Sequence, residues 1–104
     1  MDKFFVNITQ TAFDDLTDIA NYIKDSLYNP TASDNQIARI KKGVFSLSAS
    51  PYRYPFVRDR ILAALGYRSM PVDNYIIFYT VSQNNNTVDI MRILYFRRNW
   101  GDLL

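Results

Sequence analysis

The 104-residue sequence contains neither cysteine nor histidine. The lack of cysteine excludes disulfides, thiolate metal sites and a cysteine nucleophile. The lack of histidine removes the commonest zinc ligand and the side chain most often used to transfer protons near neutral pH. Any chemistry must therefore proceed without imidazole, and we expect the protein to use neither a metal ion nor another cofactor.

Long apolar runs are also missing. Nowhere do about 18 apolar residues follow one another, as a membrane-spanning helix would need. The N-terminal stretch MDKFFVNITQTAF lacks the basic run, the long apolar segment and the small-residue cleavage site of a secretory leader. We therefore expect a cytoplasmic protein that does not associate with membranes. A hydrophobic content of 48% is enough for one folded domain covering residues 1–104.

Charge is unevenly divided, although the formal net charge is only +2. Residues 1–50 carry five basic and six acidic groups, whereas residues 51–104 carry seven basic and four acidic groups. Arginine is suited to bidentate contacts with phosphate, so this half of the chain indicates an anionic partner. All seven of its basic residues are arginines, namely Arg53, Arg58, Arg60, Arg68, Arg92, Arg97 and Arg98.

A short strand and an amphipathic helix open the predicted fold. Residues 3–8 are rich in β-prone side chains and predict the first strand. Residues 11–28 predict a helix with Thr11 as its N-cap and Asp14 in its first turn. The apolar residues that recur at the spacing of one buried helical face are Ala12, Leu16, Ile19, Ala20, Ile23 and Leu27.

A second helix and an aromatic connector follow. Asn29-Pro30 ends the first helix, because a proline pushes the residue before it out of the helical region. Apolar residues at steps of three and four predict a helix over residues 33–48, capped by Thr31 or Ser33 and packed antiparallel on the first helix. Residues 51–60, PYRYPFVRDR, alternate aromatic and arginine side chains with two prolines and predict an extended connector on the surface.

The last part of the chain predicts three strands. They cover residues 67–72, 75–81 and 87–96, and the polar residues 82–86 form the turn of the final hairpin. Pro71 favours an edge position for the first of the three. The order is therefore β-α-α-β-β-β, an α+β fold with a mostly antiparallel sheet and a helical hairpin packed on one face.

The stretch from Gly66 to Trp100 resembles the RelE/ParE superfamily of toxins from bacterial type II toxin–antitoxin systems. The shared features are a Tyr-Arg pair, a Pro-Val a few residues later, an aromatic strand, a polar turn and a last strand that ends in two basic residues. In this sequence they are Tyr67-Arg68, Pro71-Val72, Tyr75 with Tyr79, and Arg97-Arg98 before Asn99-Trp100. The β-α-α order upstream also matches, so the resemblance covers nearly the whole chain.

The resemblance implies a toxin that is neutralised by a cognate antitoxin, whose C-terminal segment wraps it. RelE-like members cut mRNA in the ribosomal A site, and ParE-like members inhibit DNA gyrase. The first hypothesis is therefore ribosome-dependent mRNA cleavage, with the ribosome and mRNA as partners. The alternative is a ParE-like gyrase inhibitor without hydrolytic activity, and a third hypothesis is an inactive member that binds only its antitoxin.

The resemblance to the RelE-like nucleases also implies site residues. RNA cleavage by the adjacent 2′-hydroxyl needs a base, charge stabilisation of the phosphate and a donor to the leaving oxygen. By position the catalytic candidates are Arg68, Arg98, Tyr79 and Tyr95, and the candidates for nucleic-acid contact are Arg58, Arg60 and Arg97. Two departures favour the gyrase alternative: Ile76 stands where RelE-type enzymes carry an arginine, and their C-terminal catalytic tyrosine has no counterpart here.

Each candidate also has a purely structural interpretation. Tyr75 and Tyr79 share one face of a strand, where core packing is commoner than base stacking. The aromatic connector is similar to a stacking platform for single-stranded nucleic acid, or else it covers the end of the core. Arg58 and Arg60 are solvated side chains or contacts for an antitoxin carboxylate. The apolar face of the first helix is buried by the sheet or partly left for an amphipathic antitoxin helix.

Overall fold

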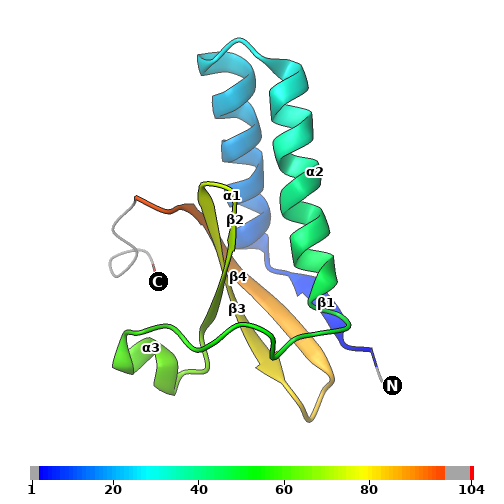
Figure 1. The fold of residues 1–104 in the computed structure, drawn as a ribbon, viewed down its shortest axis with the longest axis vertical. Coiled ribbons are helices and arrows are strands. Elements are labelled where there is room, and N and C mark those ends of the chain that lie inside the picture. Colours follow the sequence, from blue (N-terminus) through cyan, green and yellow to red (C-terminus); the bar gives the residue numbers. More distant parts are fainter. Residues whose placement is uncertain (1–2, 98–103) are drawn as a thin grey trace.

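The computed structural model describes residues 3–97 and 104. Its elements follow the predicted order, with one additional short helix (Figure 1). The sheet has the strand order β1-β4-β3-β2, and all its pairings are antiparallel except that of β1 with β4. The predicted α+β fold is therefore confirmed. The elements are β1 (Phe5–Ile8), α1 (Gln10–Asn21), η1 (Tyr22–Ser26), α2 (Pro30–Ser46), α3 (Arg60–Ala64), β2 (Arg68–Val72), β3 (Tyr75–Ser82) and β4 (Thr87–Tyr95).

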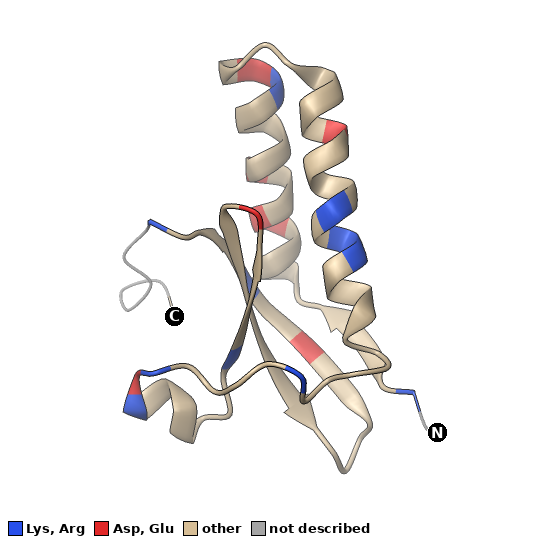
Figure 2. Cartoon of the chain, viewed as in Figure 1, with Lys and Arg blue, Asp and Glu red and all other residues tan. Residues whose placement is uncertain are grey.

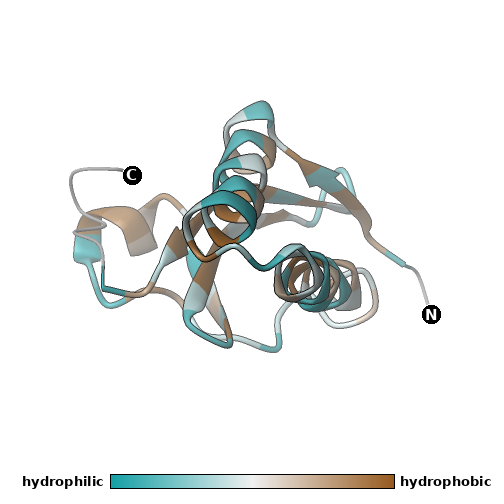
Figure 3. Ribbon diagram, turned by 90° about the horizontal axis from the view of Figure 1, so that it is seen from above, coloured by the Kyte–Doolittle hydropathy of each residue, from teal (hydrophilic) through white to brown (hydrophobic). Residues whose placement is uncertain are grey.

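The helices α1 and α2 form an antiparallel hairpin whose lower part lies against one face of the sheet (Figure 1). Seen from above, the two helices lie side by side and each mixes hydrophilic with hydrophobic residues (Figure 3). The core lies between this hairpin and the sheet, because burying their apolar faces against each other removes both from water. Its fully buried members include Ala12, Ile40, Val44, Ile77, Tyr79, Val88 and Ile90.

Helix starts differ from the predicted caps. Thr9, not Thr11, caps α1: its backbone is extended, and its Oγ1 accepts a hydrogen bond from the Ala12 amide at 3.2 Å. Asn29, not Thr31 or Ser33, caps α2 by accepting from the amide of Ala32 at 3.0 Å. In both cases a suitable side chain two to four residues earlier accepts the hydrogen bond from the free amides.

The turn between the helices also departs from the prediction of one regular helix over 11–28. After Asn21 the chain continues as a π-helix, η1, which is a rare form found often at functional sites. Pro30 is the first residue of α2, where its missing N–H costs nothing, so it starts a helix rather than only ending one. Tyr28 has a positive φ of 52° in the intervening turn.

The connector, defined as residues 51–59, contains a turn, bends and one β-bridge, and it crosses one face of the sheet (Figure 1). The helix α3 that follows it was not predicted. Asp59 caps this helix by accepting hydrogen bonds from the amides of Ile61 and Leu62 at 2.9 and 3.0 Å. With only five residues, α3 shows too little apolar periodicity to be recognised in the sequence.

The sheet has two different edges. On one side, β2 is an edge strand that contains Pro71, as predicted. On the other side, β1 pairs with β4 only as far as Ile8 opposite Ile90.

Among the described residues, none of the helices has the length and apolar character that a membrane-spanning helix needs.

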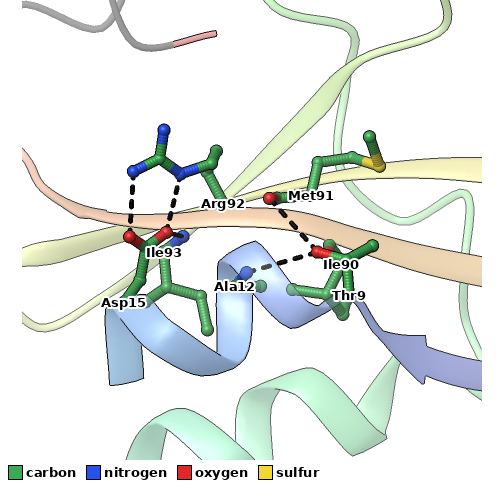
Figure 4. Close-up of polar contacts among 7 residues, drawn as sticks. All are labelled: Thr9, Ala12, Asp15, Ile90, Met91, Arg92 and Ile93. Atoms are coloured by element: carbon green, nitrogen blue, oxygen red, sulfur yellow. Dashed lines mark hydrogen bonds and ion pairs between the residues drawn. The ribbon is translucent and has the colours of Figure 1, made fainter. Parts of the chain in front are cut away.

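Beyond Ile90, β4 forms hydrogen bonds with helix α1 instead of β1 (Figure 4). The Asp15 carboxylate accepts a hydrogen bond from the Ile93 amide at 3.0 Å. It also accepts from Nε and Nη2 of Arg92 at 2.8 and 2.9 Å. Both side chains are largely buried, with 10% of Asp15 and 19% of Arg92 exposed. Asp15 therefore lies on the buried side of α1.

Candidate functional site

The connector brings several of the predicted site residues together at one end of the sheet. Phe56 forms a β-bridge with Arg68 at the start of β2, and the Val57 amide donates to the Tyr67 carbonyl at 3.0 Å. Arg68 itself pairs with Tyr79 of β3. The connector, in which aromatic and arginine side chains alternate, therefore lies next to Arg68 of β2, and Arg68 lies next to Tyr79 of β3.

Arg68 is the centre of this arrangement, which we call the Arg68 cluster: Arg68 with Tyr52, Tyr54 and Phe56. The guanidinium carbon lies 4.0 Å from the centroid of the Phe56 ring and 5.3 Å from that of Tyr52. Its Nη1 donates to the Tyr54 carbonyl at 2.6 Å. Cation–π contacts and a hydrogen bond to the backbone together hold the guanidinium in one orientation. Arg68 is half-buried rather than fully exposed.

Tyr79 is fully buried beneath the connector. Its hydroxyl donates a hydrogen bond to the carbonyl of Pro51 at 3.0 Å. Burial raises the pKa of Tyr79 above its ordinary value, and the nearby charge of Arg68 offsets this only in part. The hydroxyl therefore stays protonated and anchors the start of the connector to the sheet.

Arg58 and Arg60 flank Asp59 at the start of α3 and are exposed, as expected for residues that meet a macromolecular partner or solvent. Arg53, also exposed, lies over the Tyr54 ring at 5.0 Å and donates to its hydroxyl at 2.8 Å. The end of the molecule near Arg68 is therefore rich in arginine.

The remaining candidates lie elsewhere. Tyr95 pairs with Tyr75 at the far end of β3, four residues from Tyr79 and so about 13 Å along the strand. Arg97 follows, with its guanidinium 5.3 Å from the centroid of the Phe96 ring. Arg98 lies outside the described residues. The candidates that the structure describes are thus divided between two ends of the sheet rather than gathered at one place.

A second feature of this molecule, not recognised in the sequence, is an open groove of about 890 Å³ between the helical hairpin and the ends of β3 and β4. Its walls combine apolar side chains with tyrosines and a few charged groups. Arg39, which lines the groove, forms an ion pair with Asp73, with Nε and Oδ2 2.7 Å apart. The residues that line the groove include Asp18, Ile19, Tyr22, Ile23, Tyr75 and Tyr95.

Tyrosines are concentrated in this groove. The rings of Tyr75 and Tyr95 meet edge to face at a centroid distance of 5.9 Å. Burial raises the pKa of Tyr75, and the neighbouring Tyr95 and Tyr22 hydroxyls raise it further. Tyr22 comes from the π-helix and is 58% exposed. The helical spacing of Ile19 and Ile23 was visible in the sequence, but the meeting of α1 with the end of β4 was not.

The groove and the Arg68 cluster lie on a fold shared with known toxins. A chain of the RelBE2 toxin–antitoxin complex from Mycobacterium tuberculosis superimposes with a TM-score of 0.68 and 24% identity, covering 91% of this chain and 93% of that chain. A chain of the chromosomal ParDE system from P. aeruginosa gives a TM-score of 0.74 and 17% identity, covering 89% and 96%. This protein therefore shares its fold with chains from these two toxin–antitoxin systems.

The sequence itself matches the family model described as the ParE toxin of the type II toxin–antitoxin system parDE, over residues 6–100. A search of curated proteins found no significant match. Because the family model spans most of the chain, this protein belongs to the ParE toxin family and is the toxin component of a type II toxin–antitoxin module. The resemblance to the RelE/ParE superfamily is thereby confirmed.

Proposed function

We propose that this toxin arrests growth by binding DNA gyrase, without hydrolytic chemistry. The observation that carries the proposal is the Tyr79 hydroxyl, which is buried and donates a hydrogen bond to the Pro51 carbonyl. A general base must face its substrate and must be able to lose its proton near neutral pH. Tyr79 meets neither requirement, because its hydroxyl is covered and burial raises its pKa.

The other described candidates support the same proposal. Tyr95 is the other tyrosine candidate for the base, but it lies at the far end of β3, away from Arg68. Arg68 has its guanidinium stacked on Phe56 and bonded to Tyr54, so it already serves the protein's own structure. An RNA-cleaving site needs a base and a phosphate-binding cation within reach of one scissile bond. A target bound through a surface has no such requirement, and the match to the ParE family model favours it.

The same proposal includes the cognate antitoxin, which we place in the groove. Among the groove residues, Ile19 and Ile23 offer apolar contacts and Tyr22 offers an exposed ring with a polar tip. An amphipathic helix binds such a groove by inserting apolar side chains at steps of three and four residues. Asp18 adds a negative charge at the rim, which favours an antitoxin segment with a basic residue beside its apolar face.

Induced expression in bacteria tests the proposal. Gyrase inhibition should produce a DNA-damage response, filamentation and DNA breaks covalently linked to gyrase, with no new 5′ ends at fixed codon positions in mRNA. The Tyr79→Phe variant removes the hydroxyl but keeps the ring, so it should remain toxic. A Tyr79→Phe variant that is folded but harmless, together with codon-specific mRNA ends in the parent, would return the RNA-cleaving hypothesis to first place.

A further inference from the structure

The positive charge of this protein is concentrated in one segment. Residues 51–68 contain four arginines and one aspartate, whereas the rest of the chain contains eight basic and nine acidic residues. The single aspartate, Asp59, is engaged in capping α3. Figure 2 shows the contrast: acidic positions mark the hairpin, the β2–β3 turn and β4, and the connector carries only one, at the start of α3. This end of the molecule therefore attracts anions.

Two aromatic rings are exposed on the same segment. Tyr52 is 50% and Phe56 52% accessible to solvent. The Phe4 ring meets the Tyr52 ring edge to face at 5.9 Å and 87°, and the Arg68 guanidinium lies over Phe56 at 4.0 Å. The Arg68 guanidinium also lies 5.3 Å from the centroid of the Tyr52 ring. Both rings are thus held by contacts within the protein while about half of each residue stays exposed.

The backbone that carries these rings is fixed before any ligand arrives. The Tyr79 hydroxyl holds Pro51, the Arg68 guanidinium holds Tyr54, and the bridge between Phe56 and Arg68 joins the connector to β2. A surface that is already ordered loses little conformational entropy on binding.

The geometry points to a binding platform for single-stranded nucleic acid, formed by the rings of Tyr52 and Phe56 and the arginines around them. Bases stack on the two rings, and Arg53, Arg58 and Arg60 contact the phosphates. This combination of aromatic faces with a basic surface suits single strands of any sequence, because every base has a π-face. The platform is independent of the gyrase proposal, since it requires only that unpaired bases reach this end of the toxin.

The exposed rings distinguish this ligand from two others. An acidic protein segment would pair with the arginines but would gain little from two half-open aromatic rings. In a duplex the bases are already stacked on one another, so the rings could not reach their faces. Only an unpaired strand uses both features at once.

Fluorescence anisotropy with a labelled 15-nucleotide oligothymidylate, and with the matching oligouridylate, tests the platform on the purified full chain. Phe56→Ala and Tyr52→Ala should each weaken binding by about ten-fold, within the range measured for loss of one stacked base. Tyr52→Phe keeps the ring and should bind as the parent does. Both alanine sites are about half exposed, so circular dichroism should show folded variants. The two oligonucleotides separate a DNA ligand from an RNA ligand.

The salt dependence tests the arginines. Removing two phosphate contacts in the double variant Arg58→Ala/Arg60→Ala should lower the slope of log K against log salt by about 1.4, at roughly 0.7 per contact for single strands. The control Lys41→Ala/Lys42→Ala removes two charges from the exposed side of α2 and should leave the slope unchanged.

Three results would overturn the platform. The first is that neither oligonucleotide binds the folded chain. The second is that Phe56→Ala and Tyr52→Ala bind as the parent does while the arginine variant does not, since binding would then be electrostatic alone. The third is that a poly-glutamate peptide displaces the oligonucleotide and binds with the same dependence on Phe56, which would assign the surface to an acidic protein.

Discussion

Tyr75 and Tyr79 lie on the same strand, β3, yet they serve two regions of different character. Tyr75 lines the open groove beside the helical hairpin, and Tyr79 is sealed beneath the connector. The groove combines apolar side chains and tyrosines with a few charged groups, whereas the connector is aromatic and basic. One short sheet thus presents surfaces of different character at its two ends. A toxin built in this way can meet its antitoxin at one end while the other end faces an anionic partner.

The largest effect is expected at the wall of the groove, where Asp15 joins α1 to β4. Asp15→Ala leaves the largely buried Arg92 guanidinium without this carboxylate and frees the Ile93 amide. Breaking a buried ion pair from one side costs about 3–5 kcal/mol, a large part of the stability of a small domain. Urea unfolding measures the loss. The control Asp18→Ala, on the exposed side of the same helix, should stay within about 0.5 kcal/mol of the parent. A similar result for both variants would contradict the role given to Asp15.

The second prediction concerns the groove as the antitoxin site. Tyr22→Ala removes an exposed ring from the groove and should weaken antitoxin binding by about 30-fold, the effect of a typical aromatic hot spot of about 2 kcal/mol. Phe13→Ala is a matched control, because Phe13 is a comparably exposed aromatic residue of α1 outside the groove lining. Calorimetric titration of each variant with the antitoxin compares them. Equal losses would show that the antitoxin covers α1 differently.

The third prediction concerns the opposite end of β3. Tyr79→Phe leaves the buried Pro51 carbonyl without its donor and should cost about 1–2 kcal/mol of folding free energy. Hydrogen exchange at the Val57 amide, which bonds to Tyr67 at the base of the connector, should become faster. Tyr95→Phe changes an exposed ring at the other end and should leave both quantities near the parent values. If hydrogen exchange at the Val57 amide is as slow in Tyr79→Phe as in the parent, Tyr79 does not anchor the connector.

The smallest effect is a dependence on pH at Asp73, the ion-pair partner of the groove residue Arg39. The Arg39 guanidinium, followed by the Gln36 amide, holds the pKa of Asp73 below its ordinary value of 3.8. A lowered folded-state pKa stabilises the protein above the unfolded value, and this stabilisation is lost as the pH falls through the folded value. Asp73 is exposed, so the contribution should stay below about 0.5 kcal/mol. Asparagine tolerates the positive φ of this position, so Asp73→Asn mainly removes the charge. The variant should be slightly less stable than the parent at pH 7, and urea unfolding should show that the difference shrinks as the pH falls below 3.8.

Much of this fold follows from local patterns in the sequence. The β-branched and aromatic run at residues 75–81 predicts the central strand because such side chains suit a half-buried pleated surface. The apolar spacing of Ile37, Ile40 and Val44 predicts a helix for a similar reason. Pro71 correctly indicated an edge strand. These features depend on neighbours within a few residues, so a single sequence contains them.

The site was less predictable because its contacts join distant residues. Tyr79 meets Pro51 across 28 positions, and Asp15 meets Arg92 across 77. A signal for Asp15 existed, since it falls three residues after Ala12 and four before Ile19, on the apolar side of α1. Its partner, Arg92, could not be predicted from the spacing of residues in the sequence. Nor could the sequence show that Arg68 and Arg97 lie apart, since Arg68 begins β2 whereas Arg97 follows Tyr95 at the opposite end of β3.

The central claim, growth arrest by binding rather than hydrolysis, is tested most directly with purified gyrase and relaxed plasmid. The folded toxin and its Tyr79→Phe variant should inhibit ATP-dependent supercoiling to the same extent, and added antitoxin should reverse both. Undiminished supercoiling in the presence of a toxin preparation that still arrests growth when expressed would contradict the account.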